Sequence, residues 1–189
     1  MPMQNKFFLL FLSSSIFTCP LLEKIKLFDD AVKTASFEYE QIFVELDKEI
    51  VRGKVYIDRP LNFKIETFEP YKSELILKNE YTYRSDFELE ETIRYKTENI
   101  KSQVPAFIFL ESKKEICKLM TEASNSNSIK NLKLEEKQGE LKRISYIDQF
   151  ETFTEINFYN IDLNNELDKN LFNYNVELDL IIMNWVCWI

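Results

Sequence analysis

The sequence contains no histidine and only two glycines, Gly53 and Gly139, among 189 residues. Without histidine the chain cannot build a Ser-His-Asp or Cys-His nucleophile, a histidine-ligated zinc or haem site, or a histidine general base. Two isolated glycines cannot form a glycine-rich phosphate loop or a dinucleotide-binding fingerprint. These absences exclude the common catalytic motifs, so we expect a protein that is not an enzyme and that has no cofactor and no metal.

Positive charge is also scarce. Lysine and arginine number 24 against 32 aspartates and glutamates, a formal net charge of -8. A phosphate backbone would be repelled on average, and the sequence has no basic stripe to offset this, so we expect no nucleic-acid ligand. Hydrophobic residues make up 45% of the chain and include 16 Phe and 9 Tyr. This composition is typical of one folded domain rich in β-strands.

No hydrophobic run is long enough to span a bilayer, but the N-terminus is apolar. Lys6 precedes an apolar stretch of about eleven residues, a length that fits the hydrophobic region of a signal peptide. We therefore predict a signal peptide over residues 1–18 and a single domain over residues 19–189. A buried strand or helix is the alternative interpretation of the same stretch.

The three cysteines, Cys19, Cys117 and Cys187, form no Cys-x-x-Cys pair, which gives no support to a metal or redox site. The residues before Cys19 superficially resemble a lipoprotein box, but Phe17 and Thr18 are bulky where small residues are expected, so lipidation of Cys19 is not favoured. A Cys117–Cys187 disulfide is compatible with an oxidising compartment. The favoured interpretation of these two cysteines is that they are small buried apolar residues.

The hydrophobic period changes once along the chain. A spacing of three and four residues predicts an amphipathic helix over residues 21–35, with Leu22, Ile25 and Phe28 on its apolar side. From Phe37 to Tyr95 the period is two, and the apolar positions in each run carry odd numbers. Short connections such as the predicted tight hairpin at Asn79-Glu80 indicate an antiparallel meander.

A short apolar helix is predicted from Pro105 to Lys113, and strand patterns resume at residues 132–134, 141–147, 152–161 and 171–180. The fold class is therefore α+β, mainly antiparallel β. A sheet with one apolar face must have that face covered, either by its own helices or by an apolar ligand held between sheet and helices. The pattern alone does not separate these two possibilities.

The stretch Gly53–Glu66, with its Arg59-Pro60 turn followed by Phe63, resembles the LolA family of periplasmic carriers of outer-membrane lipoproteins. The similarity continues in order along the chain. Its other segments are Tyr39-Glu40-Gln41, Pro70-Tyr71, Leu75-Ile76, Tyr81–Glu91, Ile156–Ile161 and Leu171–Leu180. It covers residues 21–181 and leaves the apolar tail, residues 182–189, without a counterpart.

The resemblance implies an incomplete, strongly curved β-barrel in which an N-terminal helix and short lid helices cover a hydrophobic cavity. It implies a monomeric periplasmic chaperone whose cargo is acylated lipoproteins. The implied partners are an inner-membrane lipoprotein-releasing ABC transporter, which loads the cargo, and an outer-membrane lipoprotein receptor, which takes it. Two other functions stay open. One is a receptor of the same fold that is anchored to the outer membrane by lipid at Cys19, and the other is a periplasmic sensor or scaffold domain that binds protein.

Arg59 is odd-numbered, so strand alternation directs its side chain to the apolar face, where a guanidinium needs hydrogen-bond partners. The resemblance implies that Arg59 bonds to the lid backbone and keeps the empty cavity shut. The alternative is that it lies at a strand end and extends into water. The residues predicted to line the cavity, each of which would otherwise be inert core, are Phe63, Val55, Ile57, Ile65, Leu75, Leu77, Tyr83, Phe28, Phe107, Ile108 and Leu110.

Overall fold

Most of the chain belongs to one curved sheet. The structure is a computed structural model that describes residues 19–44, 49–100, 104–121, 129–148, 150–174 and 177–183. The predicted signal peptide, Cys187 and all but the first two residues of the tail 182–189 lie outside the described residues.

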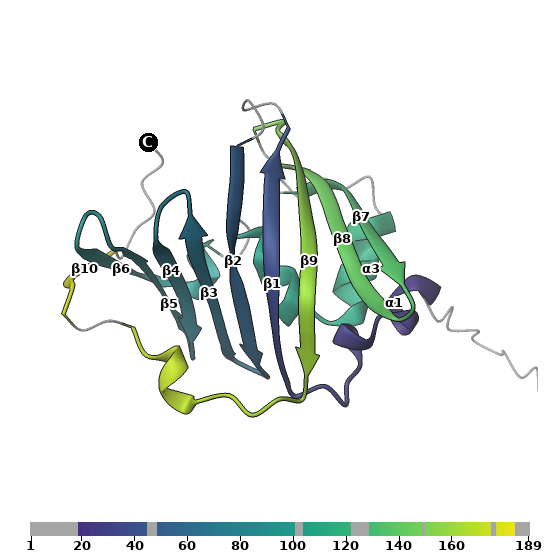
Figure 1. Cartoon of the computed structure of the whole chain (residues 1–189), viewed down its shortest axis with the longest axis horizontal. Helices are drawn as coiled ribbons and strands as arrows, with labels where there is room; N and C mark the ends of the chain where they lie inside the picture. Colours follow the sequence, from purple (N-terminus) through teal and green to yellow (C-terminus); the bar gives the residue numbers. More distant parts are fainter. Residues whose placement is uncertain are drawn as a thin grey trace, which may run out of the picture.

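Within these ranges ten strands hydrogen-bond in the order β10-β6-β5-β4-β3-β2-β1-β9-β8-β7 (Figure 1). The strands are β1 (Thr34–Phe43), β2 (Glu49–Asp58), β3 (Asn62–Glu69), β4 (Ser73–Lys78), β5 (Tyr81–Asp86), β6 (Glu91–Lys96), β7 (Ile129–Lys137), β8 (Glu140–Asp148), β9 (Phe153–Leu163) and β10 (Asp179–Ile182).

The predicted antiparallel meander is confirmed. Each strand from β1 to β6 pairs antiparallel with the next, and the hairpin at Asn79-Glu80 pairs Lys78 with Tyr81. Asn79 takes a positive φ of 58°, which suits a two-residue turn. Only β10, beside β6, runs parallel to its neighbour. Because β10 and β7 are at opposite edges and do not pair, the sheet is an open barrel, as the fold class predicted.

The helices are short, and the longer ones lie on one side of the sheet, behind it in Figure 1. They are α1 (Pro20–Lys24), η1 (Lys26–Phe28), α2 (Thr97–Ile100), η3 (Pro105–Leu110), α3 (Lys113–Thr121) and η4 (Lys169–Phe172). The helix predicted over Pro105–Lys113 is thus a 3-10 helix that ends at Leu110, followed by a separate α-helix. The strand predicted over 171–180 is wrong, because this region holds the end of η4 and the start of the short β10.

The continuous helix predicted over residues 21–35 is also wrong, although Leu22, Ile25 and Phe28 are buried as expected. A helix would use backbone N–H groups of this segment for its own bonds. Here the Ala31 N–H donates to the Asp29 side chain (2.8 Å) and the Lys33 N–H donates to the side chain of Asn164 (2.8 Å). The segment therefore breaks into α1, η1 and an extended stretch that leads into β1.

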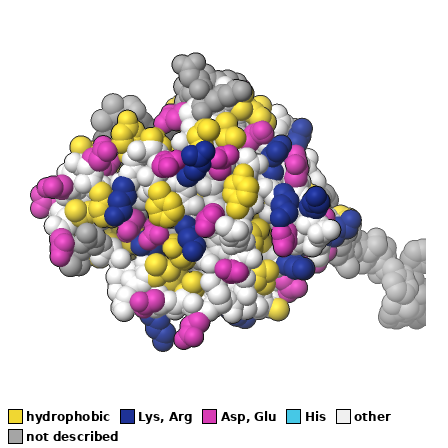
Figure 2. Space-filling view, in the orientation of Figure 1, with side chains coloured by type: hydrophobic (Ala, Val, Ile, Leu, Met, Phe, Trp, Pro, Cys, Tyr) yellow, Lys and Arg dark blue, Asp and Glu magenta, His cyan; other side chains and the backbone are white. Residues whose placement is uncertain are grey.

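The sheet has two different faces. We call the face that carries Phe37, Val55, Phe63 and Phe158 the inner face, and the helices η3 and α3 cover it. The opposite, outer face is seen in Figure 2, where charged side chains of both signs surround small groups of hydrophobic ones. The C-terminal segment runs along the lower ends of the strands in Figure 1, and η4 contacts β3 and β4 there, with Phe172 buried.

The expectation that the odd-numbered residues of every strand lie on the inner face does not hold for the whole sheet. Leu77 pairs with Thr82 across the two-residue turn, so the even-numbered residues of β5 continue the inner face. Tyr83 instead pairs with Ile76 on the outer face. A hairpin loop of two residues always pairs an odd with an even position, which is why the sequence rule fails there.

Gly53 allows the close packing of three strands. Gly53 pairs with Tyr39 of β1, and a Cβ added at Gly53 would collide with the carbonyl oxygen of Glu66 and lie 2.7 Å from Cε1 of Tyr39. The Tyr39 ring therefore occupies the space that a side chain would need, and its hydroxyl is 3.0 Å from that of Thr67. Only glycine fits at this position.

We predict that Gly53→Ala lowers the free energy of unfolding by about 2 kcal/mol, because the backbone oxygen of Glu66 has no room to move away. Denaturant unfolding followed by circular dichroism measures this change. Lys54→Ala, on the other face of the same strand, is the control and should change stability by less than about 0.5 kcal/mol. Equal midpoints for Gly53→Ala and the wild type would contradict the packing argument.

Candidate functional site

Aromatic rings join the helices to the inner face of the sheet. Phe109 of η3 packs edge-on against Phe37 of β1 (5.1 Å between ring centroids) and Phe158 of β9 (5.6 Å). Phe107 packs edge-on against Phe63 of β3 at 5.8 Å, and Phe28 stacks on Phe109 at 6.3 Å. The rings therefore come from η1, η3 and three strands, and they fill the space between the sheet and its cover.

We call the two covering segments, residues 20–33 and 104–121, the lid. All the predicted lining residues except Tyr83 belong to the core that the lid and the inner face share. Its sheet residues are Val55, Ile57, Phe63, Ile65, Leu75 and Leu77, and its lid residues are Phe28, Phe107, Ile108 and Leu110. Each lies in the face or segment where the sequence placed it.

Tyr83 is placed wrongly by the sequence. It lies on the outer face and stacks on Tyr174, with ring centroids 4.4 Å apart. Conversely, the list of predicted lining residues omits Phe37 and Phe158, which are at the centre of the aromatic cluster. Phe37 and Tyr39 are two residues apart in a strand and therefore share a face. This spacing was the signal that would have added Phe37 to the predicted lining residues.

Arg59 follows β2 immediately and binds the lid. Its guanidinium donates three hydrogen bonds, from Nη2 to the carbonyl of Leu27 (2.9 Å) and from Nη1 to the carbonyls of Val32 (3.0 Å) and Asp29 (3.2 Å). The Arg59 backbone N–H also donates to the carbonyl of Lys33 (2.9 Å). One residue at a strand end thus satisfies the carbonyls that the broken helix leaves without helical partners.

Burial lowers the pKa of the Arg59 guanidinium, because desolvation disfavours the charged form, and the negative charge of Asp30 acts in the opposite direction. The guanidinium stays protonated, since arginine does not lose its proton in proteins. The charge of the guanidinium therefore strengthens its hydrogen bonds to the lid carbonyls. Because carbonyls carry no net charge, these bonds leave the positive charge of Arg59 in place.

A hollow of about 770 Å³ opens beside Arg59, between the two lid segments. Its apolar wall includes Phe28 and Leu110, and its rim is mostly basic. The charged rim residues are Arg59, Lys33, Lys113, Lys114, Asp30 and Glu111. This hollow is the point where the lid and the strand ends meet at the surface, and it reaches the aromatic interior at Phe28.

The two lid segments are linked to each other covalently. Cys19 and Cys117 form a disulfide that joins the start of α1 to α3 across 98 residues of sequence. Close by, Lys113 Nζ lies 3.0 Å from Glu23 Oε2, and this hydrogen bond raises the pKa of Lys113. The interpretation of Cys117 as an unpaired small apolar residue is therefore wrong. Its disulfide partner is Cys19, and not Cys187, the partner that the sequence analysis gave as an alternative. A lipid attached to Cys19 through a thioether would need the thiol of Cys19. The disulfide uses this sulfur.

The arrangement offers an apolar surface for binding, covered by a lid that Arg59 contacts. In the residue ranges that the structure describes, no three His, Cys, Asp or Glu residues gather as metal ligands. No helix in the same ranges is long and apolar enough to cross a membrane. The site consists of an apolar face, an aromatic lid and one cation that holds the two together.

These features define a half-barrel with a helical lid over an apolar inner face. The chain belongs to the LolA family: residues 30–175 match the family described as "Outer membrane lipoprotein carrier protein LolA". Proteins of this family are periplasmic carriers and not enzymes, and membership supports a lipoprotein-binding role for this chain.

Solved structures show similar folds at low sequence identity. An uncharacterized conserved protein from Thermus thermophilus is 10% identical with a TM-score of 0.52, over 86% of this chain and 97% of that one. A LolA superfamily protein from Nitrosomonas europaea is 8% identical with a TM-score of 0.46, over 82% of this chain and 96% of that one. The first likeness supports the fold alone. No curated protein matches the sequence.

We predict that Cys117→Ser lowers the free energy of unfolding by about 3 kcal/mol, because it releases a long loop that the disulfide closes. A reductant should destabilise the wild type by the same amount and leave Cys117→Ser unchanged, as measured by denaturant unfolding. Cys187→Ser is the control and should behave like the wild type. Peptide mapping that joins Cys117 to Cys187 would contradict the pairing.

Proposed function

We propose that the chain is a periplasmic chaperone that binds the acyl chains of lipoproteins released from the inner membrane and carries them to an outer-membrane receptor. The observation that supports this most is the non-covalent contact between the lid and the sheet, with Arg59 at its edge. Three hydrogen bonds from Arg59 to main-chain carbonyls hold an apolar lid on an apolar sheet face. Such a lid can be displaced by an apolar ligand that replaces its contacts with the sheet.

The magnitudes suit this exchange. A buried methylene is worth about 0.8 kcal/mol, so three acyl chains of about fifteen methylenes each would cost about 36 kcal/mol to expose to water. Three hydrogen bonds from a charged group are worth about 5 to 9 kcal/mol together. Acyl chains that replace the apolar contacts between lid and sheet leave these hydrogen bonds as the main remaining cost of opening, which the acyl chains exceed. Closure of the lid favours release of the acyl chains when a receptor offers an equivalent apolar surface.

The partners and the location follow from this function. Residues 1–18 would export the chain to the periplasm as a signal peptide, and the domain would act there as a monomer. An inner-membrane ABC transporter would load it with an acylated lipoprotein, and an outer-membrane receptor would accept the cargo. The disulfide of Cys19 favours this carrier over a receptor that is lipid-anchored at the same residue. A sensor or scaffold domain, in contrast, would bind protein without acyl chains.

We predict that Phe63→Glu weakens the binding of a fluorescent diacylated peptide by at least about tenfold, because it places a carboxylate on the fully buried inner face. Fluorescence titration measures the affinity. Leu110→Glu, at the half-buried edge of the lid, tests the same idea at a position that the fold tolerates better, and it should also weaken binding.

Phe68→Glu is the matched control for this experiment. Phe68 lies on the same strand as Phe63, but it is on the outer face and 52% exposed. The Phe68→Glu variant should bind the acylated peptide with the same affinity as the wild type. Unchanged affinity in folded Phe63→Glu and Leu110→Glu would exclude the inner face as the acyl-chain site.

We predict that Arg59→Leu retains acylated peptide and delivers it to phospholipid vesicles at least about tenfold more slowly than the wild type. The substitution removes the hydrogen bonds that stabilise the closed, empty state, so the loaded state becomes relatively more stable. Stopped-flow loss of peptide fluorescence measures the transfer.

The control is Arg52→Leu, because Arg52 lies on β2, the strand that Arg59 follows, and binds Glu40 and Glu69 on the outer side of the sheet. It should transfer cargo at the wild-type rate. Normal delivery by Arg59→Leu would mean that the hydrogen bonds to the lid have no part in release.

A further inference from the structure

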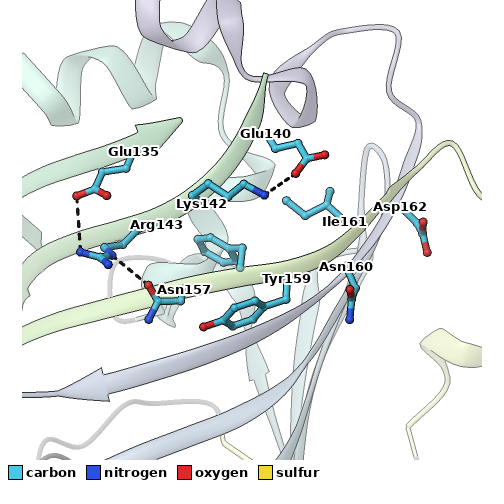
Figure 3. Close-up of a pocket in the computed structure, with 10 residues that line it drawn as sticks. Glu135, Glu140, Lys142, Arg143, Asn157, Tyr159, Asn160, Ile161 and Asp162 are labelled. Carbon is cyan, nitrogen blue, oxygen red and sulfur yellow. Dashed lines mark hydrogen bonds and ion pairs between the residues drawn. The ribbon is translucent and has the colours of Figure 1, made fainter. Parts of the chain in front are cut away.

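Two neighbouring strands in the sheet separate before they end. Residues 143–147 of β8 pair with residues 153–157 of β9. Beyond this ladder, residues 158–163 of β9 continue beside β1, while residues 140–142 of β8 stay with β7. Figure 3 shows the two strands diverging around the side chains that line the gap. We call this gap, which has a volume of about 830 Å³, the wedge.

The wedge exposes a strand edge. In an antiparallel strand, successive residues direct their N–H and C=O groups alternately to the two neighbouring strands. A bulge interrupts this alternation at residues 160 and 161, where Asn160 has a φ of 50° and the pairing with β1 passes from Tyr159 to Asp162. On each side of the bulge, the backbone groups of residues 158–159 and 162–163 that do not bond to β1 face the wedge, beyond the ladder with β8. Such an edge binds an extended peptide as an added strand.

The wedge also reaches the aromatic interior. Phe158 lines it and packs against Phe37 and Phe109 on the inner side of the sheet. The charges on the rim are largely paired with one another, with Lys142 Nζ 2.5 Å from Glu140 Oε2 and Arg143 Nη1 3.8 Å from Glu135 Oε1 (Figure 3). The wedge thus suits an uncharged polar chain that continues from an apolar group held in the core.

We propose that the wedge binds the extended peptide that follows the acylated cysteine of a lipoprotein, as a strand added to residues 158–163. This inference rests on the proposed function, because it requires the acyl chains to lie in the interior next to Phe158. The exposed edge would be about 20 Å long at 3.4 Å per residue if it were regular, and the bulge at residues 160 and 161 shortens it. Main-chain hydrogen bonds do not depend on side-chain identity, so one edge would serve cargo proteins of different sequence.

The test compares three ligands of the full chain by calorimetry. They are a diacylated ten-residue peptide, the same peptide N-methylated at alternate residues, and the diacylglyceryl-cysteine methyl ester alone. The first should bind about tenfold more tightly than the other two, because N-methyl groups remove the donors that an added strand needs. In hydrogen exchange, only the first should protect the amides of residues 158–163, whereas those of the edge strand β7 should not change.

A variant that fills the wedge gives a second measurement. Lys142→Trp places a rigid side chain in the wedge and should reduce the affinity for the acylated peptide to that for the ester. Lys133 is an exposed lysine on β7 outside the wedge, so Lys133→Trp should leave the affinity for the acylated peptide unchanged. Equal binding of all three ligands would overturn this inference while leaving the acyl-chain site intact. Failure of both the ester and the acylated peptides to bind would overturn the proposed function and this inference with it.

Discussion

The hydrogen bonds between the Arg59 guanidinium and the carbonyls of Leu27, Asp29 and Val32 are the interaction on which the rest of the closed structure depends. A charged group beside an apolar core must find polar partners, and main-chain carbonyls provide them only where a helix is interrupted. The broken helix at residues 20–33 and the half-buried arginine therefore depend on each other. Together they place Phe28 against Phe109 in the interior.

The lid is attached in two different ways. Its two segments are joined to each other by the Cys19–Cys117 disulfide, which needs a chemical reaction to open. Apart from the chain connection into β1 at Thr34, the lid contacts the sheet through hydrogen bonds and apolar contacts, which water or an acyl chain can replace. This difference makes the boundary between lid and sheet the natural place for the molecule to open, and it keeps the two lid segments together when it does.

The two faces of the sheet serve different purposes. Phe37, Phe63 and Phe158 of the inner face meet the lid through ring contacts, so these rings can separate from it without leaving broken hydrogen bonds behind. On the outer side, the C-terminal segment contacts β3, β4 and β5, and its Tyr174 stacks on Tyr83 while its Phe172 is buried. This packing supports the sheet from the side away from the lid.

The sequence by itself determined which residues of β2 to β4 face the core, because side chains alternate strictly along a strand and this local period needs no knowledge of neighbours. It also placed Arg59 on the apolar side, and its lack of histidine and its few glycines directed attention to binding functions. The tertiary structure alone decided the face of Tyr83, the partner of Cys117, the interruption of the first helix and the divergence of β8 from β9. Each of these depends on contacts between residues far apart in the chain or on the register across a turn, which a pattern within one segment does not contain.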